Sequence, residues 1–215
     1  VCRTAAEILQ HPFLLANQVG GNDDLLFDGC SLVAWPDGRV VVAPAWQEGV
    51  LLVDLAVPEN CQWIAMGEAD AFAIGEDEIK FLNSEADGFE ESTEIIEDIT
   101  DAVIAGLADY CRKSGIKRIV LGLSGGIDSA VAACVACAAV GAAKVLGIAM
   151  PSRFSSQHSL DDAKYTAEAL GMEFKIEPID GMHTALEGTI GEVLDDGNPV
   201  ASENIQSRLR GIIVM

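Results

Sequence analysis

One stretch decides the fold of the second half of the chain: Leu121-Gly-Leu-Ser-Gly-Gly-Ile-Asp-Ser-Ala130. Residues 118–123 are typical of a buried strand, and the apolar run at residues 127–140 predicts a helix. In open α/β sheets, ligands bind at the carboxyl end of a strand, beside the amino end of the next helix. We therefore expect a ligand-binding turn at residues 122–129.

The residues of this turn suit the phosphates of a nucleotide. Backbone N–H groups converge at a helix start, where the helix dipole also favours an anion. Gly125 and Gly126 allow the backbone to approach a phosphate, and the hydroxyls of Ser124 and Ser129 can donate to its oxygens. Asp128 would repel a phosphate unless a cation lies between them, so we predict that Asp128 holds Mg²⁺.

The turn is not a Walker A loop, because that loop requires a lysine after its last glycine and none follows here. A loop that binds the terminal pyrophosphate of ATP suits attack at the α-phosphate, with pyrophosphate leaving and a substrate adenylated. The alternative is a plain strand-to-helix turn with a polar cap. The aspartate, the second serine and the βαβ context disfavour that alternative.

Strands and helices alternate beyond the turn. We predict a strand at residues 144–150, a helix at 160–170, a strand at 173–177 and a helix at 201–215. Ser159 and Asp162 resemble a capping box for the middle helix. This order predicts an α/β fold with a doubly wound parallel sheet and right-handed crossovers.

The first third of the chain is β-rich. We predict a helix at residues 2–10 and strands at 13–17, 31–35, 39–43, 50–55 and 63–66. The residues between the second and third strands, Pro-Asp-Gly, indicate a β-hairpin. Residues 20–24, Gly-Gly-Asn-Asp-Asp, indicate a turn. A helix that Ser92 or Thr93 can cap follows, so we place a domain boundary near residues 84–92.

Composition limits the classes of protein to consider. The chain has 215 residues, of which 50% are hydrophobic, and this excludes a disordered protein. Its net charge of -21 repels phosphate backbones, so no nucleic-acid partner is expected. No apolar stretch approaches the roughly twenty residues of a membrane span. The first residues do not resemble a secretion leader and the cysteines are scattered, so we expect a cytoplasmic protein with reduced thiols.

Three motifs occur in the order found in one enzyme family. Residues 121–130 resemble the signature of the N-type ATP pyrophosphatases, which have an adenine nucleotide α-hydrolase-like fold. Met150-Pro-Ser-Arg-Phe-Ser-Ser-Gln-His-Ser-Leu-Asp-Asp-Ala163 resembles the segment that follows it in NAD synthetases. Glu203-Asn-Ile-Gln-Ser-Arg-Leu-Arg210 resembles their Glu-Asn-x-Gln-x-Arg-x-Arg helix. The chain is thus similar to the NAD synthetases.

A fourth resemblance concerns the first third. Asn17-Gln-Val-Gly-Gly-Asn-Asp-Asp24 with Phe27-Asp-Gly29 is similar to the late part of the nitrilase-like glutaminase domain in glutamine-dependent members. It implies that residues 1–88 end a nitrilase-like αββα domain and that 89–215 begin the ATP-pyrophosphatase domain. The glutaminase Cys, Glu and Lys would lie upstream, so no catalytic residue is assigned here. Because the chain opens on Val1 and stops at Met215 inside a predicted helix, we expect a fragment without full activity.

The resemblance implies an activity and a set of ligands. ATP adenylates the nicotinate carboxylate of deamido-NAD, and ammonia from glutamine then displaces AMP to give NAD. Asp128 would hold Mg²⁺, Asn204 would contact deamido-NAD and Arg208 a phosphate. We also expect a homo-oligomer. The residues implied to bind ATP are Gly122, Leu123, Ser124, Gly125, Gly126, Ile127, Asp128 and Ser129.

Two other functions stay open: another amide-forming ATP pyrophosphatase, such as a GMP or asparagine synthetase, and a nucleotide-binding fragment without turnover. Cys134 and Cys137 form a Cys-x-x-Cys motif, but a lone pair lacks the other ligands of structural zinc, so we expect a buried helix face. His158 is a candidate to line the nucleotide site. For His183 we expect an ordinary surface or capping role.

Overall fold

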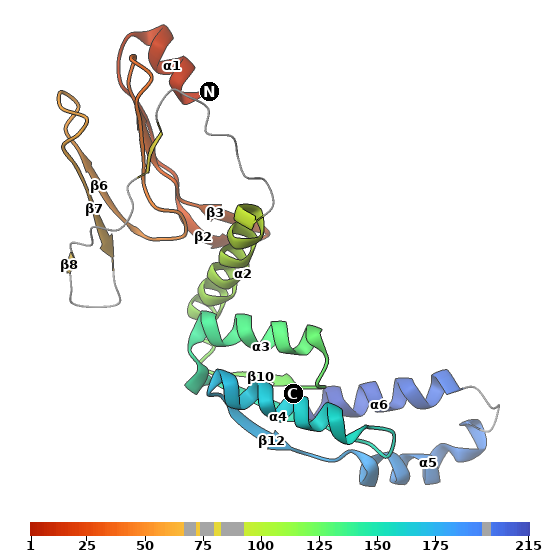
Figure 1. Cartoon of the computed structure of the whole chain (residues 1–215). Coiled ribbons are helices and arrows are strands. Elements are labelled where there is room, and N and C mark those ends of the chain that lie inside the picture. The colour runs from red at the N-terminus through yellow and green to blue at the C-terminus, as the bar shows by residue number, and fades with distance from the viewer. Residues whose placement is uncertain (67–71, 74–79, 83–92, 195–198) are drawn as a thin grey trace. The chain divides into compact units, whose positions relative to one another are not determined.

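The computed structural model describes residues 1–66, 72–73, 80–82, 93–194 and 199–215 (Figure 1). The chain forms two compact units, Val1–Tyr110 and Cys111–Met215, which divide inside the long helix α2 (Thr93–Lys113). The predicted domain boundary at residues 84–92 lies outside the described residues and stays a prediction.

The first unit is built on an antiparallel sheet. Its strands, in spatial order, are β1 (Phe13–Leu15), β4 (Leu32–Ala34), β5 (Val40–Val42) and β9 (Lys80–Leu82). Strands β4 and β5 pair as a hairpin, as predicted, and Gly38 adopts a φ of 89° in the turn between them. Alternate residues of β4 and β5 face opposite sides of the sheet, so the sheet can bury apolar side chains on both.

Each face of this sheet has its own core. Ala34 and Val40 pack with Ala6 of helix α1 (Cys2–Leu9) on one face. Their neighbours Val33 and Val41 pack with residues of β6 (Gly49–Val53) and β7 (Cys61–Met66) on the other. Strand β7 also pairs with β8 (Phe72–Ala73). The first third is therefore β-rich, as predicted.

The predicted turn at residues 20–24 is shorter than expected. Residues 20–22 belong to β2 (Val19–Asn22), which pairs antiparallel with β3 (Leu25–Asp28), and Asp23 turns the chain with a φ of 53°. The glycines are needed because α2 passes close by. A Cβ on Gly20 would lie 2.8 Å from Oδ2 of Asp109, which also accepts a hydrogen bond of 2.8 Å from the Gly21 N–H.

The second unit contains the predicted parallel sheet. Its strands lie in the order β10 (Ile119–Gly122), β11 (Val145–Ala149) and β12 (Glu173–Ile176). Helix α3 (Ile127–Val140) and the short 3-10 helix Ala142–Lys144 connect the first two strands, and α4 (Gln157–Leu170) connects the last two. Both connections move to the next strand in the same direction across the sheet. Right-handed connections of this kind place α3 and α4 on the same face of the sheet.

Helix α6 (Pro199–Val214) covers the opposite face. Leu146 and Ile148 of β11 pack against Ile213 and Val214 of this helix. Gly147 lies between them in the strand and faces the other side of the sheet, where an added Cβ would meet Leu123 and Met172. Helix α5 (Asp180–Leu194) lies beside α6 (Figure 1). Helices on both faces of a parallel sheet confirm the doubly wound fold class.

Two local expectations in this unit need correction. Helix α4 starts earlier than predicted, because Ser156 is its N-cap and accepts a hydrogen bond of 3.1 Å from the Ser159 N–H. Ser159 is therefore inside the helix and is not its capping residue. Helix α5 was not expected.

In the part of the chain that the structure describes, no helix is both long and apolar enough to cross a membrane.

Candidate functional site

A cavity of about 420 Å³ opens where the parallel strands end. Its walls come from the ends of β10 and β11, residues 122–124 and 149–151. Ser155 and the first turn of α4 form a second side, and the last turns of α6 form a third. The cavity thus lies at the edge of the sheet where ligands of doubly wound folds bind.

The turn at residues 122–129 is folded by its own polar groups. The Ser129 hydroxyl donates to the Gly126 carbonyl over 2.9 Å and accepts from the Ser124 N–H over 3.2 Å. The Gly126 N–H donates to Ser124 Oγ over 3.2 Å, and the two serine oxygens are 3.1 Å apart. Both hydroxyls therefore shape the turn. Their predicted donation to phosphate oxygens stays a prediction.

The start of α3 is open to a ligand. Its N-cap is Gly126, which is exposed and provides no side-chain cap. The first N–H groups of an α-helix have no partner within the helix, so here they remain available to an anion. This arrangement can bind a phosphate through backbone groups and the helix dipole.

Gly125 has a second role besides a possible approach to phosphate. Its φ is 78°, and a Cβ at this position would lie 2.1 Å from the carbonyl oxygen of Ser159. Only glycine lets the turn pack this closely on the first turn of α4. Gly126, with a φ of -88°, adopts a backbone conformation that other residues share.

Asp128 lies exposed in the first turn of α3. Within the described residues, no three His, Cys, Asp or Glu side chains are grouped so as to hold a metal ion. Mg²⁺ in nucleotide sites is commonly held by one or two carboxylates together with substrate phosphates and water. The exposed carboxylate beside an open helix start fits that mode of binding.

Helix α6 presents its motif on two faces. Asn204, predicted to contact deamido-NAD, and Arg208, predicted to contact a phosphate, are exposed and do not line the cavity. Arg210 does line it, and its Nε donates to the carbonyl of Met150 over 3.3 Å. Among the described residues around the cavity, Arg210 alone carries a charge. It favours an anionic ligand, although the chain as a whole is strongly acidic.

Arg210 was not among the predicted site residues. The signal was present, because Arg210 is the second arginine of the Glu-Asn-x-Gln-x-Arg-x-Arg motif. What the motif could not give was the orientation of the helix, which turns Gln206 and Leu209 into the protein and Asn204 outward. The roles predicted for Asn204 and Arg208 stay predictions.

The remaining candidates lie outside the cavity. The side chain of His158 is 86% exposed and lies 3.5 Å from Asp162, so it does not line the cavity. The expected surface role of His183 is wrong, because this residue is 1% exposed. The expected buried helix face for Cys134 and Cys137 is wrong, because Cys137 is half-buried and Cys134 is exposed. Burial and the neighbouring Cys134 raise the pKa of the Cys137 thiol.

Comparison with known proteins identifies the family. The family model described as NAD synthase matches residues 99–215, which include the turn, the cavity and the α6 motif. The chain belongs to the NAD synthase family. A glutamine-dependent NAD(+) synthetase from Rhodobacter capsulatus is 46% identical over 206 residues, which are 95% of this chain and 34% of that protein.

Other NAD synthases extend the comparison. The glutamine-dependent NAD(+) synthetase of Aquifex aeolicus is 38% identical over 213 residues, covering 92% of this chain and 37% of that protein. The chain spans about a third of the length of the curated relatives it matches.

A solved structure covers both units. The glutamine-dependent NAD+ synthetase from Acinetobacter baumannii, in complex with ADP, has a TM-score of 0.75 and 28% identity. The similarity covers 99% of this chain and 36% of that one. The match confirms the predicted fold class and the resemblance that the motifs carried.

Proposed function

We propose that this chain forms the ATP-binding part of a glutamine-dependent NAD synthetase that amidates deamido-NAD. The observation that carries the proposal is the open start of α3 beside a cavity whose charged lining residue is Arg210. It supports binding of a polyphosphate through backbone N–H groups. The family membership of residues 99–215 supports the choice of reaction.

In the proposed reaction, the turn at residues 122–129 binds the β- and γ-phosphates of ATP. An oxygen of the nicotinate carboxylate attacks the α-phosphorus, and the bond to the leaving pyrophosphate breaks. Ammonia then attacks the acyl carbon, and AMP leaves with the carboxylate oxygen that had attacked the phosphorus. Loss of a proton from the nitrogen gives the amide. The α3 N–H groups stabilise the negative charge that develops on the leaving pyrophosphate.

The residues divide between the two ligands. Asp128 would hold Mg²⁺, which neutralises phosphate charge when bound. Arg210 can contact a phosphate from the cavity wall. Asn204 and Arg208 lie on the exposed face of α6. We assign Asn204 to deamido-NAD and Arg208 to a phosphate of that dinucleotide.

Further parts of the proposal concern the whole protein. Its ammonia would come from glutamine hydrolysed in a nitrilase-like domain, of which residues 1–88 would be the end. We also propose a homo-oligomeric enzyme. We also propose a cytoplasmic location, because six scattered cysteines in a chain of 215 residues are not the dense pattern of a secreted disulfide scaffold.

The experiment uses the full-length protein with ATP, Mg²⁺ and ammonia, and offers deamido-NAD, xanthosine monophosphate or aspartate as acceptor. We expect NAD and AMP from deamido-NAD alone. Product from one of the other acceptors would favour another amide-forming pyrophosphatase. Binding of ATP without product from any acceptor would favour a nucleotide-binding protein without turnover.

A further inference from the structure

The loop between β11 and α4 forms one wall of the cavity and folds as a compact turn. The Ser152 N–H donates to Ser155 Oγ over 3.0 Å, and the Ser155 N–H donates to the Ser152 carbonyl over 2.9 Å. The Phe154 N–H donates to Ser152 Oγ over 3.3 Å. Ser152 is buried, and Ser155 lines the cavity. The position of this turn therefore sets the position of the wall.

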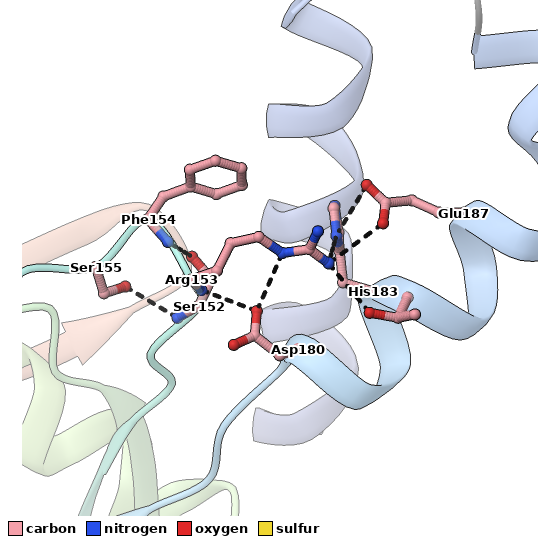
Figure 2. Close-up of polar contacts among 8 residues, drawn as sticks. Ser152, Arg153, Phe154, Ser155, Asp180, His183 and Glu187 are labelled. Atoms are coloured by element: carbon pink, nitrogen blue, oxygen red, sulfur yellow. Dashed lines mark hydrogen bonds and ion pairs between the residues drawn. The ribbon is translucent and has the colours of Figure 1, made fainter.

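Arg153 lies in the turn, and Figure 2 shows its side chain reaching Asp180, His183 and Glu187 of α5. Arg153 does not line the cavity. Its Nη2 lies 3.1 Å from Thr184 Oγ1 and 3.2 Å from Glu187 Oε2. Its backbone N–H donates to Asp180 Oδ1 over 2.8 Å, and its Nε lies 3.7 Å from the same oxygen. Nδ1 of the buried His183 is 3.4 Å from Nη2 and 3.3 Å from Glu187 Oε1.

These contacts suit positioning better than global stabilisation. The Arg153 side chain is 44% exposed and that of Glu187 is 38% exposed, so solvent screens the ion pair. One residue nevertheless ties the turn to α5 through both its backbone and its planar guanidinium. Backbone bonds continue the attachment, because the Ile179 N–H donates to the Pro151 carbonyl over 3.0 Å.

We propose that Arg153 is a positioning residue that holds the β11–α4 turn against α5, so that Pro151 and Ser155 keep their places in the cavity wall. The inference rests on the proposed function in one respect, because it takes the cavity to be the ATP site. Arg153 would not touch ATP. Its loss should weaken ATP binding by letting the wall move.

The test compares Arg153→Ala with Arg118→Ala in the full-length protein. Arg118 is a matched control, since its side chain is 47% exposed and pairs with Glu173 in the same unit, at the amino ends of the strands. The dissociation constant of a non-hydrolysable ATP analogue and the KM for ATP should rise about tenfold for Arg153→Ala, as a displaced wall predicts. Both should stay within about twofold of wild type for Arg118→Ala.

The conservative variant supplies a further readout. Arg153→Lys keeps the charge near Glu187 but has no second nitrogen to place beside Asp180 Oδ1, so it should recover only part of the affinity. We expect kcat at saturating ATP to change less than KM in both Arg153 variants. Equal analogue affinity in Arg153→Ala and Arg118→Ala would overturn the inference.

Two further outcomes can be distinguished: a variant that does not fold and a failure of the proposed function. If Arg153→Ala does not fold, the double variant Thr184→Val with Glu187→Gln removes the Thr184 hydroxyl and the charge of Glu187, and the contact of the guanidinium with Asp180 remains. It should raise the analogue dissociation constant about threefold, and an unchanged value would overturn the inference. A wild-type protein that binds the analogue but makes no NAD would contradict the proposed function, while the analogue affinities of the variants would still decide the role of Arg153.

Discussion

Two loops leave the carboxyl ends of neighbouring strands, line the same cavity and are held in different ways. The turn after β10 is fixed by bonds among its own residues, between Ser124, Gly126 and Ser129. The loop after β11 also has internal bonds, among Ser152, Phe154 and Ser155, but it is held from outside as well. Arg153 ties it to α5, and Arg210 ties its first residue to α6. A locally fixed turn can bind a ligand with little reorganisation, whereas the second loop depends on helices far along the chain. We therefore expect changes in the first loop to have the larger effects.

The largest effect is expected for Asp128→Asn, which removes the carboxylate proposed to hold Mg²⁺. NAD formation by the full-length protein should fall by at least about a hundredfold, because phosphate charge is then left unscreened. Measuring turnover against Mg²⁺ concentration checks this. Asp161→Asn is the control, since Asp161 is an exposed carboxylate of the same unit that does not line the cavity. Equal turnover in the two variants would remove Asp128 from the metal site.

Gly125→Ala should come next, because its Cβ would clash with the backbone of Ser159. We expect a loss of about 1 to 3 kcal/mol in the free energy of unfolding, together with weaker binding of the ATP analogue. Gly171→Ala is a close control, with a φ of 67° against 78° at Gly125 and no atom within 4 Å of its Cβ. Denaturant unfolding and analogue affinity are measured for both variants. Because both carry the backbone strain, the difference between them gives the effect of the clash with Ser159. Identical losses would show that the contact with α4 does not matter.

A smaller change is expected for Arg210→Ala, which removes the charge from the cavity wall and the bond to the Met150 carbonyl. The KM for ATP should rise about tenfold, because one charge-assisted contact is lost. Arg208→Ala should instead raise the KM for deamido-NAD, because Arg208 lies on the exposed face of α6. Steady-state kinetics with each substrate varied in turn distinguishes the two. The reverse pattern would exchange the roles of the arginines.

The smallest effect concerns the end of the second loop. Ser156→Ala removes the N-cap of α4 and should cost about 1 kcal/mol of stability, with little change in ATP affinity. Thermal unfolding checks this value. Ser159→Ala should cost less, because the bond from the Ser159 N–H to Ser156 Oγ remains. A larger loss for Ser159→Ala would make it the more important residue at this helix start.

The same contrast explains what could be predicted from the sequence. The first loop and the bounds of α3 were predictable, because their bonds join residues close together in the motif. Helix α5 was missed because Gly181 and Gly188 interrupt its sequence with residues that disfavour helices.

Contacts between distant residues were not predictable in the same way. The motif predicted helix α6 but not which of its faces points into the cavity. The packing of Leu209 and Ile213 decides that face. Arg153 was visible in a motif, but its acceptors lie on a helix whose existence was not foreseen. In the first unit, the glycines of β2 indicated a turn because the approach of Asp109 cannot be seen in the sequence.

The most direct test of the account follows the oxygen that joins the two substrates. Deamido-NAD labelled with ¹⁸O in its nicotinate carboxylate is converted by the full-length protein with ATP, Mg²⁺ and ammonia, and the nucleotide products are analysed by mass spectrometry. Attack at the α-phosphorus predicts one labelled oxygen in each AMP, formed in equal amount to NAD. Label in inorganic phosphate with formation of ADP, or unlabelled AMP, would contradict adenylation at this site.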